Sequence, residues 1–213
     1  MVGQGVLREC LLDPDVTQVV TIGRQATGAS HAKLREIVQK EMYDYTNIES
    51  QLAGFDACFF CLGITSVGMK EPDYKRITYD LTLAAATTLA RLNPNMTFIY
   101  VSGASTDSTE KGNIMWARVK GMTENAILRL PFKAAYAFRP GFIQPLRGIR
   151  SKTALYQFFL TLTKPLFPLL RSLFPNQILT TESIGRAMLA VAKRGAPKPV
   201  LEVRDIVELA KGA

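Results

Sequence analysis

Short apolar runs of strand length alternate with helical runs along most of this 213-residue chain. The runs with strand character are 16–23, 34–39, 57–62, 98–101, 134–138 and 200–203, and the helical patterns are 1–15, 48–53, 71–92, 114–130, 180–193 and 205–210. Strands and helices that alternate in this way indicate βαβ units and a parallel sheet. We therefore expect one α/β domain over 1–213, a doubly wound and mostly parallel Rossmann-like sheet with helices on both faces.

The segment 98–121 has the pattern of a reaction site at the carboxyl edge of such a sheet. Its strand run ends in the small residues SGAST, and the helix that follows a polar loop carries Trp116, Lys120 and Gly121. Hydroxyls after a strand and a lysine on the next helix meet at that edge. Trp116 stands four residues before Lys120, where a proton donor would be expected, and an indole ring does not titrate in water.

The chain start reads directly as a helix, with Val6, Leu7, Cys10 and Leu11 at helical spacing. Nucleotide-binding domains of this architecture begin with a strand and a glycine-rich turn before that helix. Gly3 suits the last glycine of a G-x-x-G-x-x-G turn, so we expect the first strand and two glycines to lie upstream of residue 1. The alternative is that the segment is a helix and nothing more.

Arg24 follows the run 16–23, at the position that meets the adenosine ribose in this architecture. An acidic residue there binds the 2′-hydroxyl, whereas an arginine accommodates a 2′-phosphate, which favours NADP over NAD. A solvated loop arginine is the equally weighted alternative. Gly63 ends the run 57–62 where the backbone would closely approach a dinucleotide.

Cysteine and histidine usage gives no sign of metal or disulfide chemistry. Cys58 and Cys61 form a CxxC, but they lie in an apolar run where three-residue spacing points the side chains to opposite faces of a strand. We interpret them as core cysteines of a reducing compartment rather than a redox or metal pair. His31 is the only histidine and has no acidic cluster beside it, so we expect no metal site.

The basic residues are concentrated in one part of the chain. The formal charge is +8, and residues 125–181 contain eight Lys and Arg and no Asp or Glu. This window overlaps an apolar segment, 151–174, which lysine and proline interrupt before it reaches membrane-spanning length. It suits either an anionic membrane surface or a substrate lid or dimer face within an insertion over 142–180. Without a secretory signal or a nucleic-acid motif, we expect a cytoplasmic protein that binds no nucleic acid.

Taken together, the segments MVGQGVL, IGR, CLG, YVSGAS, WARVKG, FRPG and TTESIGRAM resemble the atypical short-chain dehydrogenase/reductase superfamily. The similarity is to its NAD(P)-binding epimerase/dehydratase-like and Tat-interacting-protein-like branches, and it runs nearly end to end. The order and spacing of the pieces are more specific than any single piece.

The resemblance implies a role for individual residues. Gly3 would lie under the pyrophosphate, Arg24 would meet the ribose or its phosphate, and Met42 would pack by the adenine. Leu62 and Gly63 would line the cofactor after the fourth strand, and Arg139, Pro140 and Gly141 would pass beside the nicotinamide. Ser102 (with Ser105 as second choice) would polarise a substrate carbonyl, and Lys120 would bind the nicotinamide ribose and lower the pKa of the proton donor.

Trp116 departs from the family's Y-x-x-x-K pattern, because it stands at the tyrosine position. Loss of a positioned acid usually lowers the rate by about 10²–10⁴-fold. One hypothesis is therefore an NADP-dependent oxidoreductase or epimerase with weakened proton-donor chemistry, acting on a small apolar carbonyl or alcohol. The other is a non-catalytic NADP(H)-binding regulatory or scaffold protein.

Overall fold

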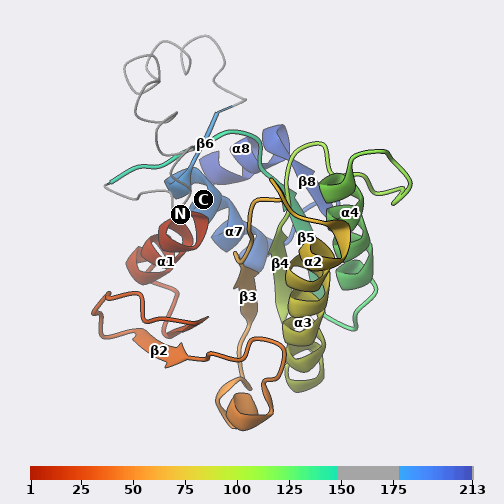
Figure 1. The fold of residues 1–213 in the computed structure, drawn as a ribbon. Helices are drawn as coiled ribbons and strands as arrows, with labels where there is room; N and C mark the ends of the chain where they lie inside the picture. Colours follow the sequence, from red (N-terminus) through yellow and green to blue (C-terminus); the bar gives the residue numbers. More distant parts are fainter. Residues whose placement is uncertain (148–177, 213) are drawn as a thin grey trace.

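The parallel strands of the computed structural model form two main sheets and one short pair (Figure 1). The structure describes residues 1–147 and 178–212. β1 (Val19–Gly23) pairs with β2 (Leu34–Val38). The larger sheet has the order β3 (Ala57–Phe60), β4 (Thr97–Val101), β5 (Ala134–Arg139) and β8 (Val200–Glu202). Because every pair is parallel, the expected Rossmann-like α/β architecture is confirmed.

Helices cover both faces of the strands. Ile99 of β4 packs in a core with α1 (Val2–Leu12), α7 (Thr181–Arg194) and α8 (Val203–Lys211). Its neighbours Phe98 and Tyr100 point to the opposite face and pack with α3 (Leu81–Leu92) and α4 (Met115–Leu128). This alternation along one buried strand is the side-chain period of a β-strand, and it divides the core into two layers.

Local sequence accounts for the start of α7. The Thr180 hydroxyl accepts a hydrogen bond from the Ser183 amide, and the Ser183 side chain accepts one from the Thr180 amide. This reciprocal capping box satisfies backbone donors that have no partner within the helix. Thr180 is therefore the N-cap of the helix that was expected over 180–193.

Several expected boundaries were wrong by a few residues. The first strand begins at Val19 rather than residue 16, because the Val16 amide donates to the Asp13 carbonyl in the turn after α1. β3 ends at Phe60 rather than residue 62. The expected helix 48–53 is a 3₁₀ turn, η1 (Thr46–Gln51).

Two further expectations need correction. The helix expected over 71–92 is interrupted, since α2 (Glu71–Lys75) passes into a π-helical turn, η2 (Arg76–Asp80), before α3. Single π turns occur often at functional sites. The insertion expected over 142–180 contains two short strands, β6 (Ile143–Gln144) and β7 (Leu179–Thr180), which pair with each other.

The apolar segment 151–174, expected to contact a membrane or form a lid, lies outside the described residues. Among the helices that the structure describes, none combines the length and the apolar character needed to cross a bilayer. β6 and β7 are the described strands on either side of this segment, and they pair with each other.

Candidate functional site

Ser102 lies directly after β4, at the carboxyl edge of the four-stranded sheet. Its amide donates to the Phe138 carbonyl of β5 at 2.7 Å, and its hydroxyl lies 3.0 Å from the Thr106 hydroxyl. Thr106 in turn donates to the Gly103 carbonyl at 2.8 Å. Ser102 is therefore a buried hydroxyl held by a short polar chain, whereas the alternative, Ser105, is exposed and has a φ of 65°.

Trp116 lies in the first turn of α4, against the turn that follows Ser102. A Cβ built on Gly103 would be 3.9 Å from Cζ3 of the indole ring. Trp116 is partly buried, so its ring occupies space beside the turn after β4 while part of the side chain faces solvent. The indole ring of Trp116, rather than a phenol, therefore lies beside the turn that follows Ser102.

Lys120 follows one helical turn later and points into the protein. Its Nζ donates to the Tyr100 hydroxyl at 3.5 Å and lies 5.3 Å from the centroid of that ring. Burial lowers the pKa of Lys120 to about 8, against the opposing effect of the nearby Glu124 carboxylate. Burial likewise raises the pKa of Tyr100, so the phenol remains a neutral hydrogen-bond partner. An amine with such a pKa can exchange a proton near neutral pH.

Gly121 lets α4 lie directly on the loop that carries Ser102. A Cβ at this position would come within 1.8 Å of the Asp107 carbonyl oxygen. The Asp107 amide also donates to the Ala117 carbonyl, and its carboxylate accepts from the Gly112 amide at 2.6 Å. The small residue after Lys120 is thus required for the close contact that sets Lys120 and Ser102 at one edge.

Arg139 and Glu124 form a buried ion pair beneath this edge. The guanidinium binds both oxygens of Glu124, with Nε at 3.0 Å and Nη2 at 2.6 Å, and it also reaches Glu202 and Ser108. Three side chains, those of Glu124, Glu202 and Ser108, therefore hold the Arg139 guanidinium. The Pro140 carbonyl accepts from the Ala104 amide at 2.9 Å, and the expected passage of Arg139, Pro140 and Gly141 beside the nicotinamide remains a prediction.

The residues expected on the cofactor side fall into two groups. Gly3 lies in the first turn of α1, where a Cβ would be 3.3 Å from the Cβ of Cys61. Gly63 has open space around it, and Leu62 is 42% exposed beside it. The start of α1 and the end of β3 therefore meet at one edge, with an open glycine and an exposed apolar side chain beside them.

Arg24 and Met42 differ in accessibility. Arg24 is exposed, directly after β1, where a ligand could reach its guanidinium. Met42 packs in the core with Ile37 and Tyr45 and exposes only 5% of its surface. The expected contact between Met42 and adenine remains a prediction, and burial leaves little of the side chain for it.

Cys58 on β3 and Cys61 directly after it face opposite sides of the sheet, as their spacing predicted. Cys58 packs with one core layer and Cys61 with the other, and burial raises the pKa of both thiols to about 12. Such thiols are protonated and unreactive at neutral pH. Within the described residues there is no cluster of three or more metal-binding side chains.

Three residues that matter here were not singled out from the sequence. Tyr100 could have been found, because it lies on the predicted strand two residues before Ser102, and the two-residue period of a strand points it to the same face. Glu124 lies one helical turn after Lys120. Gly5 carried no signal, yet a Cβ there would be 2.5 Å from the Thr181 carbonyl oxygen, so α1 and α7 touch at this glycine.

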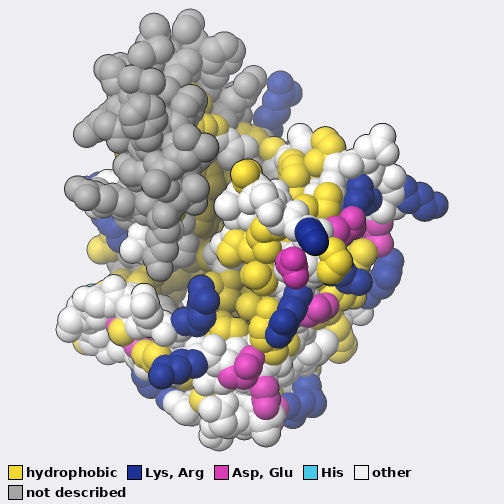
Figure 2. All heavy atoms as spheres, in the orientation of Figure 1, with side chains coloured by type: hydrophobic (Ala, Val, Ile, Leu, Met, Phe, Trp, Pro, Cys, Tyr) yellow, Lys and Arg dark blue, Asp and Glu magenta, His cyan; other side chains and the backbone are white. Residues whose placement is uncertain are grey.

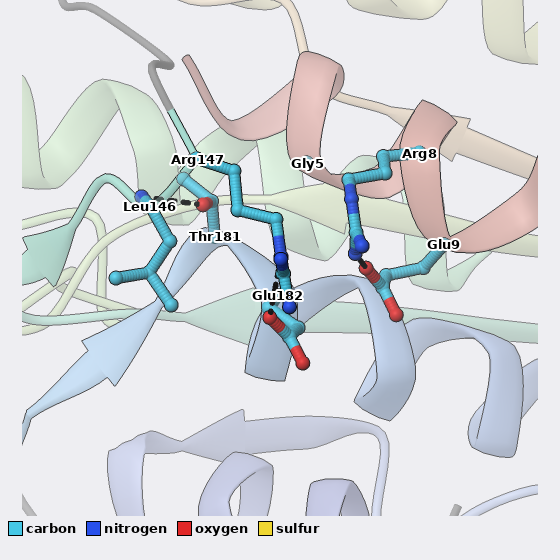
Figure 3. A pocket seen from close by; sticks show the side chains of 7 residues that line it. All are labelled: Gly5, Arg8, Glu9, Leu146, Arg147, Thr181 and Glu182. Carbon is cyan, nitrogen blue, oxygen red and sulfur yellow. Dashed lines mark hydrogen bonds and ion pairs between the residues drawn. The ribbon is translucent and has the colours of Figure 1, made fainter. Parts of the chain in front are cut away.

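A small pocket lies beside this α1–α7 contact (Figure 3). Its charged side chains are paired: Arg8 with Glu9, and Arg147 with Glu182. None of the residues expected to bind cofactor or substrate lines it. It is best explained as a small gap in the packing of α1 against α7, with ion pairs among the residues that line it.

The fold defines the class as a Rossmann-like α/β protein. No protein-family model matches the chain. "Protein fmp52, mitochondrial" from Emericella nidulans is 31% identical over 167 residues, which cover 75% of this chain and 70% of that protein. The chain therefore belongs to the family of fmp52, within the short-chain dehydrogenase/reductase superfamily.

Solved structures share the fold at low sequence identity. ADP-L-glycero-D-manno-heptose-6-epimerase of Helicobacter pylori has a TM-score of 0.68 and 14% identity, over all of this chain and 77% of that one. The enzyme WbmG of Bordetella bronchiseptica, solved in complex with NAD, has a TM-score of 0.66 and 11% identity over 100% and 74% of the two chains. A UDP-N-acetylglucosamine 4-epimerase from Methanobrevibacter ruminantium M1 has a TM-score of 0.63 and 14% identity over 94% and 72%.

Proposed function

We propose that the protein binds NADP(H) and acts as a slow oxidoreductase or epimerase on a small apolar carbonyl or alcohol. The observation that carries the proposal is the arrangement at the end of β4, where the buried Ser102 hydroxyl and the partly desolvated Lys120 flank the carboxyl edge. Dinucleotides bind at this edge in open α/β sheets. WbmG, a structure of the same fold, was solved with NAD.

The residues present fit a dinucleotide. No side chain caps the first turn of α1, and backbone amides at a helix start favour a pyrophosphate; Gly63 has open space around it after β3. Arg24 offers an exposed guanidinium for a 2′-phosphate. The exposed apolar side chains of Leu62, Ile64, Val67 and Ile114 suit an apolar substrate.

In this proposal each residue has one task. A bound nicotinamide would supply or accept the hydride. Ser102, whose hydroxyl lies 3.0 Å from that of Thr106, would donate a hydrogen bond to the substrate oxygen. In the reduction, Ser102 or water would then supply the proton that this oxygen takes up after the hydride has reached the carbonyl carbon. Lys120, with a pKa of about 8, would bind the cofactor ribose and favour negative charge developing nearby. Trp116 would shape the pocket and donate no proton.

Steady-state NADPH oxidation over a panel of small carbonyl compounds tests this proposal. We expect low activity that Ser102→Ala abolishes and that Trp116→Tyr raises by about 10²-fold or more, since tyrosine restores a positioned acid. Trp116→Phe is the matched control, because it changes ring size without adding a hydroxyl. Equal rates for Trp116→Tyr and Trp116→Phe would contradict the proposed role of this position.

Cofactor preference is tested separately by fluorescence titration with NADPH and NADH. Arg24→Ala should weaken NADPH binding by about tenfold and leave NADH unchanged, because only NADPH has the 2′-phosphate. Arg35→Ala on β2, another exposed arginine near β1, is the control. Identical losses for both cofactors would remove the argument for NADP.

The presence of Trp116 favours a second candidate function, a regulatory or scaffold protein that binds NADP(H) without turnover. The ring lies against the Ser102 turn, where it could fill the substrate space. This candidate predicts tight NADPH binding, no oxidation over the panel, and no gain from Trp116→Tyr. Absence of NADPH binding would contradict both functions.

The cellular location is also a proposal. The relative's name places fmp52 in mitochondria, which favours an organelle-associated protein over the free cytoplasmic one expected from the sequence. Fractionation of cells that express the protein at its native level distinguishes the two. The same fractions, washed with high salt, would show whether it is held at a membrane by charge.

A further inference from the structure

Arg118 lies on α4 between Trp116 and Lys120, and its guanidinium joins two loops. Nη1 donates to the Gly112 carbonyl at 2.6 Å, and Nη2 donates to Oε2 of Glu71 at 2.7 Å. Gly112 belongs to the loop between β4 and α4, and Glu71 is the first residue of α2, directly after the loop that follows β3. One side chain therefore connects the segments that leave the carboxyl ends of two paired strands.

The loop between β4 and α4 is held firmly near Gly112. The Asp107 carboxylate accepts from the Gly112 amide at 2.6 Å. The side chain of Asn125 on α4 donates to the Ser108 carbonyl at 3.0 Å, which fastens the same loop to the helix. The Gly112 carbonyl is therefore a fixed support for the Arg118 side chain.

The loop between β3 and α2 (61–70) is more exposed, and its own hydrogen bonds are local. The Met69 amide donates to the Ser66 carbonyl at 3.1 Å, and Val67 is 83% exposed. In the space-filling view, hydrophobic side chains gather at the middle of the face, and acidic and basic side chains lie together over α2 and α4 (Figure 2). The contact with Arg118 thus fastens the end of a loop that has few contacts of its own.

The exposure of the pair indicates that this contact serves position more than overall stability. The side chains of Arg118 and Glu71 are 23% and 44% exposed, and ion pairs of this kind contribute little to stability. A planar guanidinium, however, holds two acceptors in a fixed relative geometry, which the single nitrogen of a lysine cannot do. The helices that carry the pair, α2 and α4, pack side by side (Figure 1).

We propose that Arg118 is a positioning residue that fixes the loop between β3 and α2 relative to the loop between β4 and α4. Phe60 pairs with Tyr100, so the residues that follow β3 and β4 leave the sheet at the same level. Arg118 thereby keeps the exposed Leu62 and Ile64 beside the edge that carries Ser102. That these side chains contact an apolar substrate rests on the proposed function, whereas the fixing of the loop rests only on the contacts of Arg118.

Hydrogen exchange of the full chain, without cofactor or substrate, tests the fixing of the loop. Arg118→Met keeps a long side chain but removes both donors, and Arg129→Met, at an exposed arginine that ends α4, is the matched control. We expect Arg118→Met to speed exchange of the Met69 amide by about two- to fivefold, the range of a partly exposed ion pair. Exchange at the Thr97 amide of β4 should stay unchanged.

Equal exchange at Met69 in Arg118→Met and Arg129→Met would overturn the proposal. Arg118→Lys retains the charge but offers one nitrogen, so it should recover less than half of the lost protection. Full recovery by lysine would show that charge alone fastens the loop, and it would overturn the role of the contact with Gly112.

Steady-state NADPH oxidation with a small apolar carbonyl tests the consequence for the site. Arg118→Met should raise KM by about two- to fivefold and leave kcat unchanged, because it moves side chains that bind the substrate and leaves Ser102 in place. A fall in kcat at constant KM would overturn this role. Faster exchange with no turnover in any variant, the unmodified chain included, would support the loop contact and count only against the proposed function. Turnover with unchanged exchange would support that function and overturn the role of Arg118.

Discussion

The four-stranded sheet and the β1–β2 pair are both parallel, but they differ in how deeply their strands are buried. β4 buries Thr97, Phe98, Ile99 and Tyr100, whereas each residue of β1 remains partly exposed. Ser102, Lys120 and the buried Glu124 belong to the closed region, and Arg24 belongs to the open one. The reaction edge is therefore preorganised by packing, while the ribose side has fewer contacts to hold it.

The largest expected difference between the regions comes from the buried ion pair. Glu124→Gln leaves the Arg139 guanidinium with one weaker partner in a site where Glu124 is 1% exposed. We expect the free energy of unfolding to fall by about 3–5 kcal/mol, as measured by urea denaturation. Glu49→Gln, which disrupts the more exposed pair with Arg91, should change it by less than about 1 kcal/mol. Equal losses would show that the two regions are stabilised alike.

Matched isoleucines compare the strands directly. Ile99 of β4 is fully buried, so Ile99→Ala should cost about 2–5 kcal/mol through lost burial and the cavity left behind. Ile22 of β1 is partly exposed, and Ile22→Ala should cost under about 2 kcal/mol. Denaturant titrations of both variants give the comparison, and a cost at Ile22 equal to that at Ile99 would contradict the open state of β1.

At the carboxyl edge, the crowded Gly121 can be compared with Gly63, which has open space around it. Gly121→Ala forces a Cβ onto the Asp107 carbonyl, so we expect a loss of about 1–3 kcal/mol from overpacking. Gly63→Ala has open space and should leave the thermal midpoint nearly unchanged. If the backbone of Gly63 approaches the dinucleotide, the same variant should weaken NADPH binding, which titration measures. Unchanged stability of Gly121→Ala would show that the loop can move away from α4.

The smallest effect is a pH dependence from Lys120. Its folded pKa of about 8 lies below the value of 10.5 for a free lysine, so between these values the unfolded chain binds more protons and stability rises with pH. Below pH 8 the buried charge costs its full penalty. Lys120→Met should therefore stabilise the protein by roughly 1–2 kcal/mol at pH 7 and flatten this rise. Lys111→Met, at an exposed lysine, should leave both unchanged.

The alternation of strand and helix patterns was sufficient to predict the fold class and the order of the elements. The spacing of Cys58 and Cys61 also predicted that they face opposite sides of the sheet, because the two-residue period of a strand depends only on neighbours in the sequence. Strand ends were less predictable. Val16 and Leu62 continue an apolar pattern past the point where their backbone leaves the sheet.

The sequence by itself determined the parallel plan, the edge that carries Ser102 and Lys120, and the replacement of the expected acid by Trp116. Only the tertiary structure shows that Arg139 donates hydrogen bonds to Glu124 and that Lys120 donates one to the Tyr100 hydroxyl. The same holds for the close approach of Gly5 to Thr181 and of Gly121 to Asp107. It also decided that β1 and β3 stay unpaired. These features depend on atoms distant in the sequence, and a local pattern contains no information about which distant groups become neighbours.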